Sequence, residues 1–245
     1  MTTILITSSV KVSAPYTSLT NEEERAKLTL EALKKWLAIA PTYKIVICDG
    51  SNYNFSNDCK KSFPNADIEC LFFENNTSLV SEYGKGYGEG EIIEFALKNS
   101  SFLKHENFFI KCSARIWVKN FNKILISWNG IFECDLGLKR NNLRVPIIPY
   151  YVDTKFYIVN KNFYLKHFLN VYKNVRDKEW NFIEHEFFKS LVSINKKVGH
   201  YLVSQKPIIL GVSGTYGTKY NTSRFYFLKK KITHFIKSYI IKAYY

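Results

Sequence analysis

Two cations and a hydroxyl group recur at alternate positions near the middle of the chain. Lys111, Ser113 and Arg115 follow an apolar run, and in an extended backbone residues two apart point to the same face. Arginine also presents a planar fork that binds two oxygens of one anion, which lysine cannot do. The spacing predicts a site for a diphosphate or a carboxylate, although a solvated strand face would show the same spacing.

Four glycines alternate with other residues around Lys85, directly before a helical pattern. Glycine lets backbone N–H groups approach an anion, and the N-terminus of a helix favours negative charge. We therefore predict a phosphate-binding loop at Lys85, Gly86 and Gly88. The spacing fits neither a Walker loop nor a dinucleotide fingerprint, and a flexible loop that caps the helix is the alternative.

Asp49 stands at the end of a predicted strand, where ligands bind in open α/β sheets. Its carboxylate could accept hydrogen bonds from a ribose or a base, but an Asp-Gly-Ser turn explains the same residues. The segment 211–217 is rich in small residues and follows another strand pattern. It reads as a wall against a ligand or as a simple turn, and it lacks the second glycine of a serine hydrolase elbow.

Carboxylates and an imidazole in the second half are candidates for a general base, which must lie near an acceptor hydroxyl with a suitable pKa. Asp153 precedes a predicted strand, and Glu184 with His185 lies in a predicted helix. Glu133 and Asp135 alternate on one strand face. Each of these residues, taken alone, also fits a structural role.

Alternating strand and helix patterns must position these groups. The first half shows β-α-β, then strand, loop, helix and strand, which predicts an α/β fold with parallel strands. The second half is more irregular. Strands are expected at 3–7, 44–49, 68–73, 108–118, 131–136, 155–159 and 206–212, and helices at 21–40, 92–97, 162–171 and 180–194.

Length and composition indicate one globular domain. The chain has 245 residues, 46% of them hydrophobic, and a formal net charge of +14, which favours an anionic partner such as nucleic acid, anionic lipid or a phosphorylated small molecule. Its five cysteines form no CxxC pair, as expected in a reducing compartment. The first residues lack the basic start of a signal peptide, and no apolar run approaches the ~20 residues of a membrane span. We expect a cytoplasmic protein.

The segment 219–245 carries only positive charges and has an apolar stripe at helical spacing. This pattern is typical of a basic amphipathic helix on an anionic membrane, or of a helix packed on the core with a basic outer face. The stripe consists of Phe225, Leu228, Ile232, Phe235, Ile236, Tyr239 and Ile240.

The order of these parts resembles the GT-A class of nucleotide-sugar glycosyltransferases, especially those that build bacterial capsule and lipopolysaccharide. The resemblance rests on the opening strand with Thr7-Ser8-Ser9, on Asp49, on the loop around Lys85 and on Lys111 to Arg115. The last segment is similar to a K-x-[ST]-G-R-Y motif of that class, with Ala114 for glycine and Ile116 for tyrosine.

The resemblance implies a GT-A-like (Rossmann-like) α/β fold, with a mixed, mainly parallel sheet flanked by helices and a basic amphipathic C-terminal helix. One catalytic domain would span 1–218, with a nucleotide-sugar half at 1–120 and an acceptor half at 121–218, before the tail at 219–245. The partners would be a nucleotide-sugar donor, a glycan or lipid-linked glycan acceptor, and an anionic membrane at the inner face of the plasma membrane.

The resemblance also implies separate catalytic and donor-binding roles for the candidate residues. The catalytic set is Asp153, Glu184, His185 and Arg115. The donor-binding set is Thr7, Ser8, Ser9, Asp49, Lys85, Gly86, Gly88, Lys111 and Ser113. The Asp-x-Asp motif that holds a metal in typical members is replaced by Lys111 to Arg115, so we expect no metal cofactor and cations that stabilise the departing phosphate. Asp67 with Glu69, and Glu133 with Asp135, are the fallback metal sites.

Two other functions fit parts of the pattern. The charge and the many aromatic residues suit a nucleic-acid-binding protein, but much of the aromatic content lies in apolar runs, so no nucleic acid partner is expected. A sugar-phosphate nucleotidylyltransferase would need a glycine-rich loop after the first strand, and the segment 7–14 contains no glycine.

Overall fold

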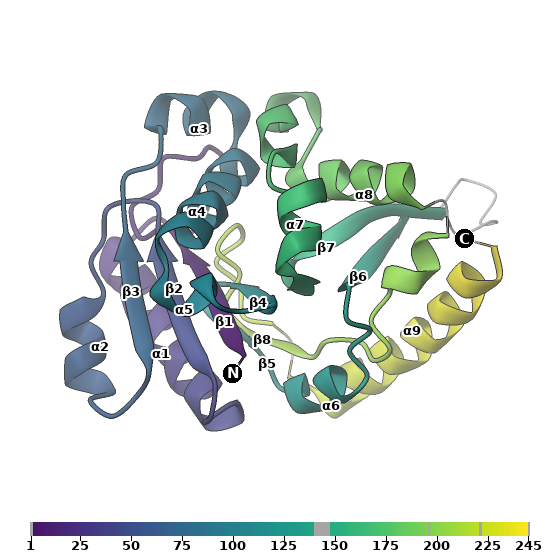
Figure 1. Cartoon of the computed structure of the whole chain (residues 1–245), viewed down its shortest axis with the longest axis horizontal. Coiled ribbons are helices and arrows are strands. Elements are labelled where there is room, and N and C mark those ends of the chain that lie inside the picture. The colour runs from purple at the N-terminus through teal and green to yellow at the C-terminus, as the bar shows by residue number, and fades with distance from the viewer. Residues whose placement is uncertain (1, 140–147, 196, 221, 245) are drawn as a thin grey trace.

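A computed structural model describes residues 2–139, 148–195, 197–220 and 222–244, and for Arg224, Ile240 and residues 242–244 it describes the backbone alone. Its main sheet has the strand order β3-β2-β1-β4-β7-β6. The strands β1 to β4 are parallel, and β7 is antiparallel to both β4 and β6. The predicted α/β class with a mixed, mainly parallel sheet is therefore confirmed (Figure 1).

The first half follows the predicted β-α-β order. Asn21 caps α1 by accepting a hydrogen bond from the Glu24 amide at 2.8 Å, as its position before three glutamates predicts. The elements are β1 (Thr3–Ser8), α1 (Glu22–Ile39), β2 (Lys44–Asp49), α2 (Ser56–Ser62), β3 (Ile68–Phe72), α3 (Thr77–Tyr83), α4 (Lys85–Asn99), α5 (Ser101–Lys104), β4 (Phe108–Ser113) and β5 (Ile116–Val118).

The second half is less regular than the predicted helices suggest. Trp180 adopts a left-handed φ of 59°, so the helix expected from this residue begins only at Ile183. The elements are α6 (Phe121–Ile126), β6 (Phe132–Lys139), β7 (Ile148–Asn160), α7 (Lys161–His167), η1 (Val171–Asn174), η2 (Asp177–Glu179), α8 (Ile183–Ile194), η3 (Val198–Tyr201), β8 (Ile209–Gly211) and α9 (Arg224–Tyr244). The short strands β5 and β8 form a second, two-stranded sheet.

The two faces of the main sheet bury two hydrophobic clusters, because successive side chains of a strand point to opposite faces. In β1, Leu5 joins the cluster under α4 and α8, whereas Ile4 and Ile6 join the cluster under α1 and α6. Trp36 of α1 is fully buried and donates its indole N–H to the Ile116 carbonyl at 3.1 Å. The helices thus fix the carboxyl ends of β1 and β4 between two packed layers.

The helix α9 packs on the body through its polar side. His234, Lys237 and Ile241 are buried, and Lys237 contacts the carboxylate of Asp135 and donates to the Leu136 carbonyl at 2.7 Å. The predicted apolar stripe stays largely exposed instead, and Phe225, Phe235 and Tyr239 are each at least 75% exposed. The side chain of Ile240 lies outside the described part of the chain.

Candidate anion-binding site

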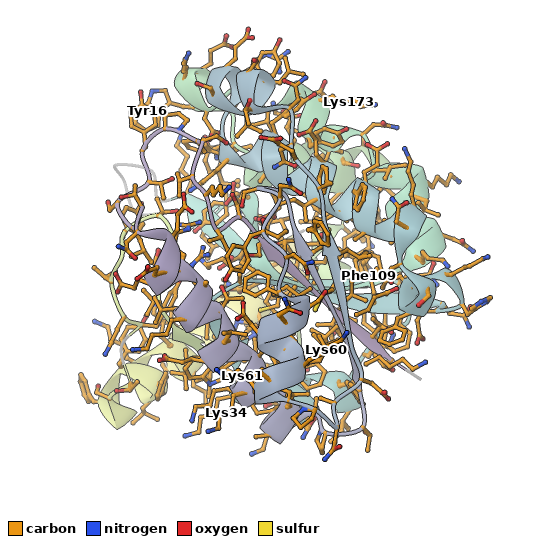
Figure 2. The ribbon with its side chains drawn as sticks, turned by 90° about the vertical axis from the view of Figure 1, so that its left-hand side faces the viewer. Tyr16, Lys34, Lys60, Lys61, Phe109 and Lys173 are labelled. Carbon is orange, nitrogen blue, oxygen red and sulfur yellow. The ribbon has the colours of Figure 1, made fainter. Side chains whose placement is uncertain are left out.

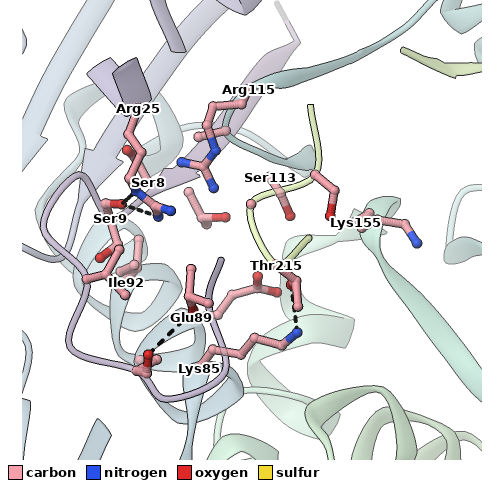
Figure 3. Close-up of a pocket in the computed structure, with 18 of the residues that line it drawn as sticks. Ser8, Ser9, Arg25, Lys85, Glu89, Ile92, Ser113, Arg115, Lys155 and Thr215 are labelled. Atoms are coloured by element: carbon pink, nitrogen blue, oxygen red, sulfur yellow. Dashed lines mark hydrogen bonds between the residues drawn. The ribbon is translucent and has the colours of Figure 1, made fainter. Parts of the chain in front are cut away.

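A polar cavity of about 190 Å³ lies at the carboxyl ends of β1 and β4, between the N-terminal part of α4 and the segment 212–215 (Figure 3). The predicted small-residue wall is the far side of this cavity. Hydroxyl groups and cations line the cavity, with apolar side chains between them. The hydroxyl groups and cations belong to Thr7, Ser8, Ser9, Ser13, Thr17, Arg25, Lys85, Ser113, Arg115, Lys155, Ser213, Thr215 and Tyr220.

Arg115 is the strongest sign of a missing ligand. Its side chain is 8% exposed, yet Nε and Nη1 are buried without a hydrogen-bond partner among the described residues. A β-carbon at Gly214 would collide with Nη2, so glycine there makes room for the guanidinium. A buried charge without partners is costly unless a ligand satisfies it.

The electrostatics of Arg115 agree with this interpretation. Burial, with a smaller contribution from the neighbouring Arg25, lowers the pKa of its guanidinium to about 9, and Asp49 acts in the opposite direction. The hydroxyl oxygen of Ser8, Oγ, is a second buried polar group without a hydrogen-bond partner among the described residues. An anion in the cavity could therefore accept hydrogen bonds from the guanidinium of Arg115 and from the hydroxyl of Ser8.

Arg25 comes from the first turns of α1 and was not among the predicted site residues. Its Nε and Nη2 donate to the Ser9 carbonyl at 3.0 and 2.5 Å, and its Nη1 donates to the Leu19 carbonyl at 2.7 Å. Burial lowers its pKa, against the opposing effect of Asp49. Arg25 therefore fixes the segment after β1 and adds a second positive charge beside Arg115. Its place among helix-forming residues gave no signal of this role.

The extended arrangement predicted for Lys111, Ser113 and Arg115 ends at the strand terminus. Arg115 has a φ of 66°, in the left-handed region that non-glycine residues rarely adopt, and it lies in the turn between β4 and β5. Ser113 and Arg115 line the cavity, and Lys111 does not.

Lys111 is fully buried and has used all its donors. Its Nζ lies 2.7 Å from Glu89 Oε1, 2.7 Å from the Thr154 carbonyl and 3.1 Å from Ser113 Oγ. An ammonium has three hydrogens, so Lys111 holds its neighbours and has no donor left for a phosphate. Through this ion pair it orients Glu89, a carboxylate on the cavity wall that sequence reasoning had missed.

The predicted phosphate-binding loop is instead the first part of α4, and this expectation is corrected. Gly84 has a φ of 109° and precedes the helix, whose first amide, that of Lys85, donates to Asp177 Oδ2 at 3.1 Å. A carboxylate of the protein thus already caps this N-terminus. A β-carbon at Gly86 would lie 2.8 Å from Ile183, and one at Gly88 would lie 2.9 Å from Asn75 Nδ2. These glycines permit close packing.

Lys85 reaches the cavity through its side chain. Its Nζ donates to Thr215 Oγ1 at 2.9 Å, which links α4 to the segment after β8 (Figure 3). Gly88 also lines the cavity, and Gly86 does not.

Asp49 is a turn former in this structure. Its carboxylate accepts hydrogen bonds from the amides of Val10, Ser51 and Tyr53 at 3.0, 2.8 and 3.2 Å, and from Ser51 Oγ at 2.6 Å. It is fully buried and does not line the cavity. The expected contact with a ribose or base is therefore replaced by contacts with the loops after β1 and β2.

Two of the predicted catalytic carboxylates lie beside the cavity. Asp153 forms an ion pair with Lys155 at 2.9 Å. Burial raises the pKa of Glu184, and Glu89 and Asp153 raise it further while Lys85 opposes them. Glu89, Asp153 and Glu184 thus form a group of acids within electrostatic range of one another.

His185 is separated from this group. Its ring packs against Tyr150 with centroids 4.6 Å apart, and its Nδ1 accepts a hydrogen bond from the Phe182 amide at 3.3 Å. It does not line the cavity, so the predicted pair of Glu184 and His185 is split between two environments.

The fallback metal sites are occupied by protein groups. Glu69 accepts hydrogen bonds from the hydroxyl of Ser100 and the amide of Ser101, and Asp135 contacts the ammonium groups of Lys206 and Lys237. Across the described residues no three His, Cys, Asp or Glu side chains gather in an arrangement that could hold a metal ion.

The cavity is suited to an anion with several oxygens. Its volume is below the roughly 300–1,000 Å³ of pockets that enclose a drug-sized ligand, so it would hold the phosphate-sized part of a larger molecule. Guanidinium groups in a water-poor site bind phosphate oxygens strongly and with fixed geometry. The neighbouring carboxylates could accept a proton from a hydroxyl group.

No protein-family model and no curated protein sequence matches this chain. Among solved structures, it is similar to the galactosyltransferase LgtC in complex with donor and acceptor sugar analogues, with a TM-score of 0.49 and 11% identity over 77% of this chain and 70% of LgtC.

Two further solved structures show the same level of similarity. One is a glycosyltransferase involved in glycosylation of the major capsid of PBCV-1, with a TM-score of 0.43 and 15% identity over 82% of this chain and 79% of that one. The other is the glycosyltransferase GlyE of Streptococcus pneumoniae TIGR4, with a TM-score of 0.47 and 9% identity over 82% of this chain and 44% of that one. Because these TM-scores lie below 0.5, they establish no activity for this chain, whose fold class follows from its own sheet order.

Proposed function

We propose that this protein is a glycosyltransferase that moves a sugar from a nucleotide-sugar donor to a glycan or lipid-linked glycan of the bacterial surface. The observation that carries the proposal is the buried, unpartnered guanidinium of Arg115 beside Arg25, in a hydroxyl-lined cavity at the carboxyl edge of a parallel sheet. Such an edge is where ligands bind in open α/β sheets. The diphosphate of the donor would occupy this cavity.

The proposed reaction exchanges one C–O bond for another. The bond between the anomeric carbon and the donor phosphate breaks, and a bond from that carbon to an acceptor oxygen forms. The acceptor hydroxyl loses its proton to a carboxylate, for which Asp153 and Glu184 are candidates beside the cavity, and Glu89 is a third. The nucleoside diphosphate leaves with the bonding electrons, and its new negative charge is stabilised by Arg115, Arg25 and Lys85.

In this proposal the fixed cations replace a divalent metal. The position of the usual Asp-x-Asp motif holds Lys111 to Arg115, and Arg115 provides a charge that needs an anion. Turnover should therefore survive a chelator. Loss of turnover with a chelator and its return with Mn²⁺ would refute the metal-free mechanism while leaving the transferase reading intact.

A thermal-shift screen against UDP, GDP, CMP and their sugars tests the enzyme proposal. A ligand that binds only the folded protein stabilises it by mass action and so raises the melting temperature. At a ligand concentration of a hundred times Kd, the free energy of unfolding rises by about 2.7 kcal/mol. We expect one nucleotide class to stabilise the wild-type protein and not Arg115→Met. Lys34→Met is the matched control, because Lys34 is exposed on α1 (Figure 2). If no nucleotide stabilises the wild type, the enzyme proposal fails.

The proposal also assigns the outer face of α9 to the anionic inner face of the plasma membrane. Six apolar side chains of its stripe are at least 50% exposed, and three consecutive lysines, Lys229, Lys230 and Lys231, lie on the same helix. Apolar area and positive charge together favour an interface rich in anionic lipid. No helix of the described residues is long and apolar enough to cross a membrane.

Vesicle sedimentation tests this assignment. The wild type should sediment with phosphatidylglycerol vesicles and much less with phosphatidylcholine vesicles, and Ile232→Glu with Ile236→Glu should abolish sedimentation. Lys60→Glu with Lys61→Glu, on α2 (Figure 2), changes the charge of a different surface by a larger amount. Equal loss in both variants would attribute binding to net charge alone.

A further inference from the structure

A second, larger cavity of about 1020 Å³ lies between α9 and the body of the protein. Its inner wall is the segment 204–209 together with Asn120, Lys123, Asp153, Lys155 and Tyr220, and its outer wall is one flank of α9. This volume is at the upper end of the roughly 300–1,000 Å³ of ligand pockets. We call it the α9 groove.

The α9 groove combines an apolar surface with an excess of positive charge. Ile208, Ile209, Phe227, Leu228 and Phe235 contribute apolar side chains. The charged lining residues are Lys123, Lys155, Lys206, Lys230, Lys231 and a single carboxylate, Asp153.

The positive charges of the groove are only partly neutralised. Asp153 pairs with Lys155, and Asp135 alone contacts the ammonium groups of both Lys206 and Lys237. Lys230 and Lys231 form no ion pair within the described residues. A ligand with both an apolar chain and a negative charge would complement this surface.

The groove also meets the anion cavity. Lys155 and Tyr220 line both spaces, and Asp153, paired with Lys155, faces the groove. A molecule in the groove could therefore place a hydroxyl at the boundary, next to a carboxylate and close to the donor phosphates. Leu228, Phe235 and Tyr239 of the exposed apolar stripe also line the groove, so the groove opens onto the surface assigned to the membrane.

We propose that the α9 groove binds the acceptor substrate, and that this acceptor is an anionic amphiphile: an apolar chain joined through phosphate to the hydroxyl-bearing group that receives the sugar. The inference rests on the proposed glycosyl transfer and selects the lipid-linked acceptor over a free glycan. The chain lies against the apolar wall, the phosphate lies near Lys206, Lys230 and Lys231, and the accepting hydroxyl lies near Asp153.

Calorimetric titration with monomeric octyl phosphate tests the groove directly. Octyl glucoside supplies the chain without the charge, and inorganic phosphate supplies the charge without the chain. The wild type should bind octyl phosphate more tightly than either. Ser238→Trp, which fills the groove from α9, should abolish this binding, and Thr233→Trp, on α9 but outside the groove, should leave it unchanged. Lys230→Gln with Lys231→Gln should weaken it by about tenfold or more, as expected for two lysines near an anionic group.

The outcomes separate this inference from the proposed function. If Ser238→Trp binds octyl phosphate as the wild type does, or if the wild type does not bind it, the groove is not the acceptor site. A third outcome is that neither the wild type nor Ser238→Trp binds octyl phosphate, whereas both bind anionic vesicles. In that case α9 is a membrane contact only. Nucleotide stabilisation of all these variants should stay as in the wild type, and its absence would refute the donor site instead.

Discussion

Lys111 and Arg115 stand four residues apart around the end of β4, and both were predicted to bind phosphate. Lys111 is fully buried and gives its three donors to Glu89, Thr154 and Ser113. Arg115 is almost as buried, but two of its nitrogens have no partner in the described chain. The comparison teaches that burial of a cation does not define a binding site. Unused donors do, because the protein has satisfied one cation and left the other for a ligand.

The same substitution should act in opposite directions at the two positions. Lys111→Met should lower the free energy of unfolding by about 3 kcal/mol, because it leaves the carboxylate of Glu89 and the carbonyl of Thr154 without their donor. Urea denaturation measures this. The double variant Lys111→Met with Glu89→Gln should recover at least about 1 kcal/mol. A loss below about 0.5 kcal/mol in the single variant would mean that Lys111 is not the structural cation of the pair.

Arg115→Met should raise the free energy of unfolding by about 2 kcal/mol, because it removes a buried charge that lacks partners. The same denaturation experiment in an anion-poor buffer measures the change. Destabilisation as large as that of Lys111→Met would mean that Arg115 has a structural role like its neighbour's.

Anion binding should depend on pH through Arg115. The pKa of its guanidinium is lowered to about 9, by burial and by Arg25, against Asp49. Below pH 9 the guanidinium of Arg115 is charged in the folded protein, and this buried charge lowers the free energy of unfolding. The penalty falls as the pH rises from about 9 toward the pKa of arginine in the unfolded chain. Sulfate binds the charged form, so its affinity should be level between pH 7 and 8 and fall about tenfold per pH unit well above 9.

Sulfate is the suitable probe because its own charge is constant over this range. Calorimetry between pH 7 and 10.5 gives the profile, and Arg115→Met should lack the decrease that begins near pH 9. A wild-type affinity that stays level to pH 10.5 would exclude Arg115 as the titrating ligand.

The smallest effect is expected at the N-terminus of α4. Asp177→Ala removes the carboxylate that accepts from the Lys85 amide, and the loss of a helix cap costs about 1 kcal/mol. Anion affinity should not change, since the proposed site lies at Arg115 and Arg25 and not at this terminus. A large gain or loss of sulfate binding would return the phosphate site to the glycine-rich segment.

Much of the fold was readable from local patterns. The apolar runs that became β1 and β2 are buried strands of a parallel sheet, the run that became β3 is its half-buried edge strand, and Asn21 before three glutamates marks the start of α1. The glycine-rich segment was misread because alternate glycines are typical of loops. In the fold they lie in α4, where Ile183 and Asn75 approach too closely for a side chain, and such contacts come from elements that are distant in sequence.

The candidate site was readable only in part, for the same reason. Ser113 and Arg115 lie in the cavity as their spacing suggested, but the left-handed turn at Arg115 has no signature in the sequence. Arg25 was missed because it lies in a helix of ordinary composition, and nothing in that local sequence indicates that the fold places its side chain beside the end of β1. The apolar stripe of α9 was recognised, whereas its exposure depends on contacts of His234 and Lys237 with the body.

A calorimetric titration with pyrophosphate, at pH 7.5 and low ionic strength, tests the central claim that Arg115 and Arg25 form the phosphate site of the donor. The wild type should bind one pyrophosphate, and Lys34→Met should bind it equally. Arg115→Met should bind it about a hundredfold more weakly, because two charge-assisted hydrogen bonds worth about 1.5 kcal/mol each are lost. Equal affinity in the wild type and in Arg115→Met would contradict the claim.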